Sequence, residues 1–70
     1  MKNIHYQCNM SSDIIEIKVR NLNKVIYRAS CPISNKKRIN EILICLEYKG
    51  FIDLSGLKKI KERVEQRWFE

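Results

Sequence analysis

The apolar residues of this chain recur first at every second position and then at every third or fourth, and the change occurs at Pro32. Strict alternation over residues 4–10, 14–20 and 25–31 is typical of half-buried strands, because successive side chains of a strand point to opposite faces. Proline cannot donate to a strand ladder, so Pro32 is expected to end the third strand. The expected inward positions are Ile4, Tyr6, Cys8, Met10, Ile15, Ile17, Val19, Val25, Tyr27, Ala29 and Cys31.

The loop between the second and third expected strands decides how they pair. A two-residue loop would set Val19 opposite Ile26 and mix the two faces of the sheet, whereas a three-residue loop sets Val19 opposite Tyr27 on one face. We therefore predict the longer loop. Asn21 or Asn23 is expected to take the left-handed conformation, which asparagine tolerates.

Two helices are expected after Pro32. Ser34 is the predicted N-cap of the first, which runs to about residue 49 and is closed by Gly50. The second begins near Asp53 and covers residues 54–68. The positions predicted to face the core are Ile39, Ile42, Leu43 and Leu46 in the first helix, and Leu57, Ile60, Val64 and Trp68 in the second.

This order, β-β-β-α-α, predicts one α+β domain over residues 1–70. We expect a three-stranded antiparallel meander with a C-terminal helical hairpin packed on one face, which leaves the other face solvated. A chain this short buries only about 60% of its unfolded surface, so a second copy that covers more of it would add stability. A homodimer is therefore one expected partner arrangement.

The apolar runs and the cysteines indicate a cytoplasmic protein without a membrane span. The longest apolar run, residues 42–46, is far shorter than a membrane-spanning helix. The chain has an odd number of cysteines, namely Cys8, Cys31 and Cys45, and their spacing fits neither a disulfide framework nor a zinc knuckle. We expect them to pack as small apolar residues in a reducing compartment. A metal site built from the three cysteines with His5 is the alternative, and it requires His5 to face inward.

No motif for catalysis or for a cofactor is visible. His5 is the one histidine, it is expected on the outer face of the first strand, and no local motif places a nucleophile or an acid beside it. The two glycines, Gly50 and Gly56, stand at expected helix ends and form no phosphate-binding loop. We therefore expect neither an enzyme nor a bound cofactor or metal.

The charge of the chain points to an anionic partner. The net charge is +6, and both expected helices begin with basic residues, although the N-terminal end of a helix disfavours cations. Three basic groups are candidates for anion binding: Lys36, Lys37 and Arg38 at the first helix start; Lys58, Lys59, Lys61 and Arg63 at the second; and Lys18, Arg20 and Arg28 on the outer sheet face.

The expected spacing of these groups favours an extended partner. An antiparallel hairpin separates the two helix starts by roughly 22 Å, which suits a polyanion such as nucleic acid or a ribonucleoprotein better than a small anion. The competing interpretation is a solvated helix surface on which Lys58 pairs with Glu62 and Lys61 with Glu65. Inward-facing tyrosines disfavour a sheet that stacks bases, so contact along the phosphate backbone is the expected mode.

The first helix also suggests a different function. Ile44 and Tyr48 project away from its core-facing residues, so they either contact the second helix or form an exposed patch with Phe51. Phe69 falls off the core-facing side of the second helix and is a further candidate. The alternative to polyanion binding is therefore a small regulatory or inhibitory protein that docks on another protein through Ile44, Tyr48, Phe51 and Phe69.

Overall fold

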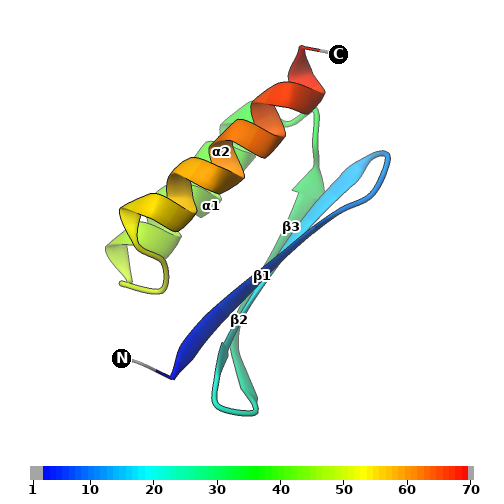
Figure 1. The fold of residues 1–70 in the computed structure, drawn as a ribbon. Coiled ribbons are helices and arrows are strands. Elements are labelled where there is room, and N and C mark those ends of the chain that lie inside the picture. The colour runs from blue at the N-terminus through cyan, green and yellow to red at the C-terminus, as the bar shows by residue number, and fades with distance from the viewer. Residues whose placement is uncertain (1–2, 70) are drawn as a thin grey trace.

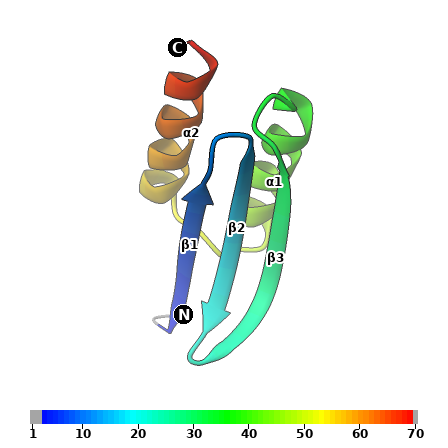
Figure 2. The same cartoon turned by 90° about the vertical axis from the view of Figure 1, so that its right-hand side faces the viewer.

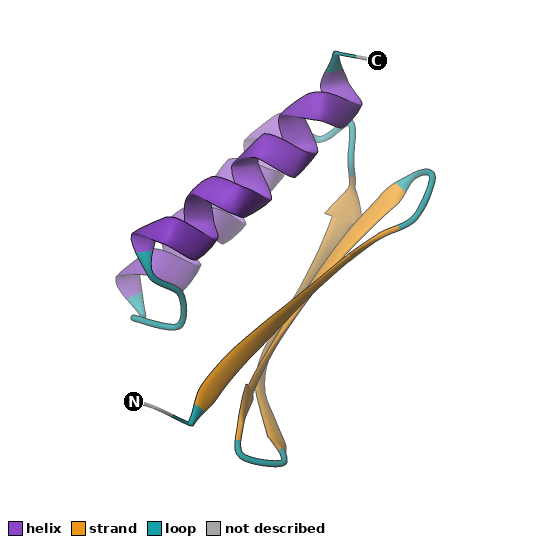
Figure 3. Ribbon diagram, viewed as in Figure 1, coloured by secondary structure: helices purple, strands orange, loops and turns teal. Residues whose placement is uncertain are grey.

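A three-stranded sheet and a helical hairpin form two layers in the computed structural model, which describes residues 3–69 (Figure 1). This is the α+β architecture predicted from the sequence. The elements are β1 (Ile4–Met10), β2 (Ile14–Asn21), β3 (Lys24–Pro32), α1 (Lys36–Tyr48) and α2 (Leu54–Trp68). Both helices lie on the same side of the sheet, as the colouring by secondary structure shows (Figure 3).

The sheet is an antiparallel meander in the order β1-β2-β3 (Figure 2). β2 is the central strand, and its inward residues Ile15, Ile17 and Val19 are at most 1% exposed. They lie beneath the helices and between two neighbouring strands. The alternation of β2 therefore predicts its buried face correctly.

β2 and β3 pair in the predicted register over most of their length, but the loop between them is not the predicted one. Val19 lies opposite Tyr27, as expected. The loop itself is shorter than predicted, because Asn21 pairs with Lys24, and a bulge beside Val19 takes up the extra residue. The expected left-handed asparagine was wrong too: the positive φ belongs to Leu22, at 59°.

The bulge also corrects the expected position of Val25. Beyond the bulge Val25 pairs with Arg20, which faces away from the helices, and Val25 is 41% exposed. One extra residue in a strand shifts the pairing by one position, so the residues of β3 between the bulge and the loop are on the opposite face from the one predicted. The prediction that Val25 faces the core was therefore wrong.

The helices begin at caps with clear hydrogen bonds. Asn35, not the predicted Ser34, caps α1, and its Oδ1 accepts a hydrogen bond from the backbone N–H of Arg38 at 3.1 Å. Asp53 caps α2 and accepts from the N–H of Gly56 at 2.8 Å. Gly50 ends the turn after α1 with φ at 74°, a conformation that glycine adopts without strain.

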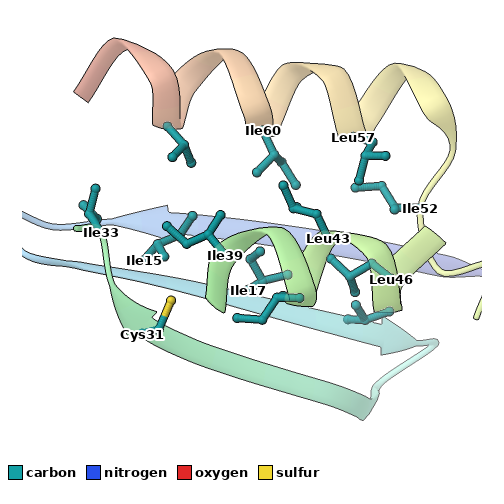
Figure 4. Packing of buried hydrophobic residues seen from close by; sticks show 13 residues of the cluster. Ile15, Ile17, Cys31, Ile33, Ile39, Leu43, Leu46, Ile52, Leu57 and Ile60 are labelled. Carbon is teal, nitrogen blue, oxygen red and sulfur yellow. The ribbon is translucent and has the colours of Figure 1, made fainter. Parts of the chain in front are cut away.

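The core lies between the two layers, as Figure 4 shows. The predicted inward residues of both helices are buried with the exception of Trp68, which is half-buried. Trp68 donates from Nε1 to the carbonyl oxygen of Ile33 at 2.6 Å and so joins the end of α2 to the segment between β3 and α1. The helical members of the core are Ile39, Ile42, Leu43, Leu46, Leu57, Ile60 and Val64.

Candidate polyanion-binding surface

The basic group at the start of α1 is exposed, but two of its three members have partners within the chain. The Nζ atom of Lys36 lies 5.0 Å from the centroid of a Trp68 ring, a cation–π distance. Arg38 forms an ion pair with Glu41 at 3.4 Å. Lys37 forms no ion pair with another described residue. The cations that the α1 dipole disfavours are therefore partly accounted for by local contacts.

The basic group at the start of α2 also contains both a residue with a partner inside the chain and residues without one in the described part of it. Arg63 reaches across to β1, and its Nη1 donates to the carbonyl oxygen of Cys8 at 3.4 Å. The i,i+4 pairs of the competing interpretation, Lys58 with Glu62 and Lys61 with Glu65, are not formed among residues 3–69. Three lysines remain in solvent: Lys58, Lys59 and Lys61.

The two helix-start groups do not converge. α1 and α2 run antiparallel, so α1 begins where α2 ends (Figure 1). The contact between Lys36 and Trp68 marks this end of the hairpin. Any anion that touches both groups must therefore span the length of the hairpin.

The outer face of the sheet brings its basic residues together. Lys18 on β2 lies directly opposite Arg28 on β3, and Gln7 on β1 lies on the other side of Lys18. Arg20 follows two residues after Lys18, with His5 opposite it on β1. Since neighbouring strands are about 4.8 Å apart, these side chains share one small area.

This area carries little negative charge. Glu16 is the one acid among the outward-facing positions of the three strands. It forms an ion pair with Arg28, with 3.6 Å between Oε2 and Nε. Lys18 and Arg20 form no ion pair with any described residue. Both helices lie against the opposite face, so they leave this area uncovered (Figure 2).

Sequence reasoning missed two members of this surface. Alternation places His5 and Gln7 outward, but neither is among the predicted anion-binding residues. The pairing of β1 with β2 shows that His5 lies beside Arg20 and Gln7 beside Lys18. Strand register was the information that the sequence did not supply, because the period of one strand does not say which residue lies opposite on the neighbouring strand.

The residues of the alternative protein interface fall in three places. Ile44 and Tyr48 are 66% and 89% exposed and lie one turn apart on the outer side of α1. The ring of Phe51 instead packs against Tyr27, with 5.9 Å between centroids. Phe69 is 82% exposed but follows α2, at the opposite end of the hairpin from Tyr48. Only the first two residues form a common patch.

The cysteines are positioned as packing residues. Cys8 lies on β1 and Cys31 on β3, with β2 between them. Burial raises the pKa of both thiols above the ordinary value, although Arg63 beside Cys8 and Arg38 beside Cys31 act in the opposite direction. Within residues 3–69, no group of three or more histidine, cysteine or acidic side chains is arranged to hold a metal ion.

Comparisons with protein-family models, with curated proteins and with solved structures find no match to this chain. In the part of the chain that the structure describes, neither helix is long and apolar enough to cross a membrane.

Proposed function

We propose that this protein is a small non-enzymatic module that binds a polyanion, such as the phosphate backbone of a nucleic acid, through the outer face of its sheet. One observation carries the proposal: Lys18 and Arg28 lie directly opposite each other on an uncovered face. Like charges in that position destabilise a sheet. A bound anion removes the repulsion, and Arg20 adds a third cation beside the pair.

An extended anion fits this face better than a small one. The cations are spread over β2 and β3, and the contacts that most favour a single phosphate, such as buried donors, are lacking among the described outward residues. Binding to such a surface is driven by the release of counterions from the polyanion and has little sequence preference.

Contact with the phosphate backbone is also favoured over stacking of bases. Tyr6 and Tyr27 lie on either side of the fully buried Val19 and so share its inward face, although Tyr6 is 38% exposed. Sheets that stack bases carry aromatic residues on their open face. The outer face instead presents amide and cationic side chains, which bind phosphate oxygens. The lysines at the start of α2 lie on the other layer and extend the positive field without joining this face.

The proposal is tested with two double variants of equal charge. Lys18→Ala with Arg28→Ala removes two cations from the sheet face, and Lys37→Ala with Lys59→Ala removes two from the helices. Binding to a fluorescently labelled nucleic acid is measured by anisotropy at several salt concentrations. We expect the sheet variant to lose about tenfold or more in affinity and about two units of the salt slope. Equal losses in both variants would contradict the proposal.

The second candidate function is docking on another protein. The observation that favours it is the exposed pair formed by Ile44 and Tyr48, since an apolar patch on the solvent-facing side of a helix is typical of an interface. In this case the chain would be a small regulatory or inhibitory protein that docks on its partner through this patch. Tyr48→Asp should then release a co-purifying protein that high salt retains, whereas Phe69→Asp should not, because Phe69 lies at the other end of the hairpin.

A further inference from the structure

The two edges of the sheet differ in how their backbone groups are satisfied. At β1 the carbonyl oxygen of Cys8 accepts from Arg63, and those of Ser11 and Ser12 in the next turn accept from Arg67 at 2.9 and 2.6 Å. β3 pairs with β2 on one side, and no strand among the described residues pairs with its other side (Figure 2). A strand edge of this kind accepts a further strand.

The hydrogen bonds that are present show which β3 groups point outward. The N–H of Ile33 donates to Asp13, which continues the pairing of Pro32 with Ile14 by one step. Antiparallel ladders alternate between bonded and non-bonded pairs, so Cys31 and Ala29 also bond to β2. The N–H and C=O groups of Arg28 and Ser30 therefore point to the free edge, together with the C=O of Pro32.

We propose that the occupant of this edge is a second copy of the chain, paired antiparallel through β3 about a two-fold axis at Ala29. This register bonds Arg28 of each copy to Ser30 of the other, which uses the outward N–H and C=O groups of these two residues in each copy. Ala29 then meets its own copy at the axis, where a non-bonded pair comes closest and a small side chain fits. Pro32 pairs with Ile26 of the other copy and needs only its C=O.

The neighbouring registers are less favourable. An axis at Arg28 sets the two Arg28 side chains directly opposite each other, which is repulsive. An axis at Ser30 pairs Arg28 with Pro32, which has no N–H to donate. An axis at Tyr27 pairs Arg28 with Ile26, where the bulge disturbs the ladder. With the axis at Ala29 both Arg28–Ser30 pairs are free of these faults, and Pro32 and the bulged Ile26 meet only at the two ends of the seam.

The side chains on the outer face support the same register. Ser30 lies between Glu16 on its own β2 and Arg28 of the second copy. Because serine is short, the arginine of one copy extends over it toward the glutamate of the other. Exposed Ile26, at 38%, meets Pro32 of the second copy on this face. The contact is thus complementary in charge and partly apolar, and it is the same on both sides, as a two-fold interface requires.

The pairing has a consequence for binding, which rests on the proposed function. A two-fold axis perpendicular to the sheet keeps both outer faces on one side, so the Lys18–Arg28 pairs of the two copies lie on the same side of the dimer, in two rows that are offset by two residues. The two Arg28 residues lie diagonally across the seam, about 7–8 Å apart. A polyanion that spans the seam neutralises this charge, so polyanion binding and dimer formation strengthen each other.

The experiment measures the mass of the protein by sedimentation over about a hundredfold range of concentration, without any ligand. We expect the mass to rise from one chain toward two. Ser30→Pro removes an outward N–H that β2 does not use, so this variant should stay at one chain, while Ser30→Ala keeps the N–H and should behave as the unchanged protein. A dimer that persists in Ser30→Pro uses another surface and overturns the proposal.

Amide hydrogen exchange of the unchanged protein gives a test that no folding defect can affect. The N–H groups of Arg28 and Ser30 should become protected as concentration rises, while the N–H of Tyr6 at the β1 edge should not change. A single-chain mass at every concentration, with Arg28 and Ser30 exchanging freely, overturns the proposal. Both readouts are independent of nucleic acid, so loss of the dimer is distinguished from failure of polyanion binding, which the anisotropy experiment measures.

Discussion

Lys18 and Arg28 lie opposite each other on neighbouring strands, and both face away from the helices because Lys18 alternates with the buried residues Ile17 and Val19. Their repulsion lowers the stability of the sheet, so removing one charge should raise it. We expect Lys18→Gln to raise the free energy of unfolding by about 0.2–1 kcal/mol at low salt. Urea unfolding measures the change. Salt screens the repulsion, so the gain should shrink at high salt; a loss of stability at low salt would contradict the expectation.

Leu22 holds a left-handed conformation that leucine disfavours, with φ at 59° and a side chain that is 67% exposed. Leu22→Asn should raise the free energy of unfolding by about 0.5–1 kcal/mol, because asparagine adopts this conformation at lower cost and little apolar contact is lost. Leu22→Ala is the matched control. It keeps the disfavoured conformation and should show no such gain in urea unfolding.

Trp68 joins α2 to the segment before α1 through its hydrogen bond to the carbonyl oxygen of Ile33. Trp68→Phe keeps an aromatic ring but removes the donor, and it should lower the free energy of unfolding by about 1–2 kcal/mol. The neighbouring exposed residue provides a control, since Phe69→Ala should change stability by less than about 0.5 kcal/mol. Equal effects of the two substitutions in urea unfolding would show that the hydrogen bond contributes little.

Stability should fall at alkaline pH. Burial raises the pKa of the Cys8 and Cys31 thiols and of the Tyr27 phenol above their ordinary values. As pH rises, these groups therefore ionise first in the unfolded chain, so they leave the free energy of unfolding unchanged near neutral pH and lower it above roughly pH 8.5. Urea unfolding at pH 7 and at higher pH measures the decrease. Cys31→Val removes one such group and should make the decrease smaller.

Much of the fold follows from the period of the apolar residues. Alternation along β2 predicts its buried residues, and helical spacing predicts the buried stripe of both helices. The details at turns are harder to predict, because neighbouring polar residues offer similar local hydrogen bonds. Ser34 and Asn35 are both good N-caps, and the helix begins at Asn35.

The candidate site was predictable only in part. The basic residues are visible in the sequence, but their partners lie on distant segments. Arg63 contacts β1, and Lys36 contacts the end of α2. Because of these tertiary contacts, fewer cations of the two helix-start groups are available to a ligand. Strand register in turn places Lys18 beside Arg28 on the outer face. Neither effect follows from the period of a single element.

The most direct test of the proposed function is NMR mapping with a short nucleic acid on the unchanged protein. Titration at low salt should shift the backbone signals of Lys18, Arg20 and Arg28 most, and high salt should reverse the shifts. The signals of Ile44 and Tyr48 should stay in place. Shifts confined to the helix starts, or no shifts at low salt, would contradict polyanion binding by the outer face of the sheet.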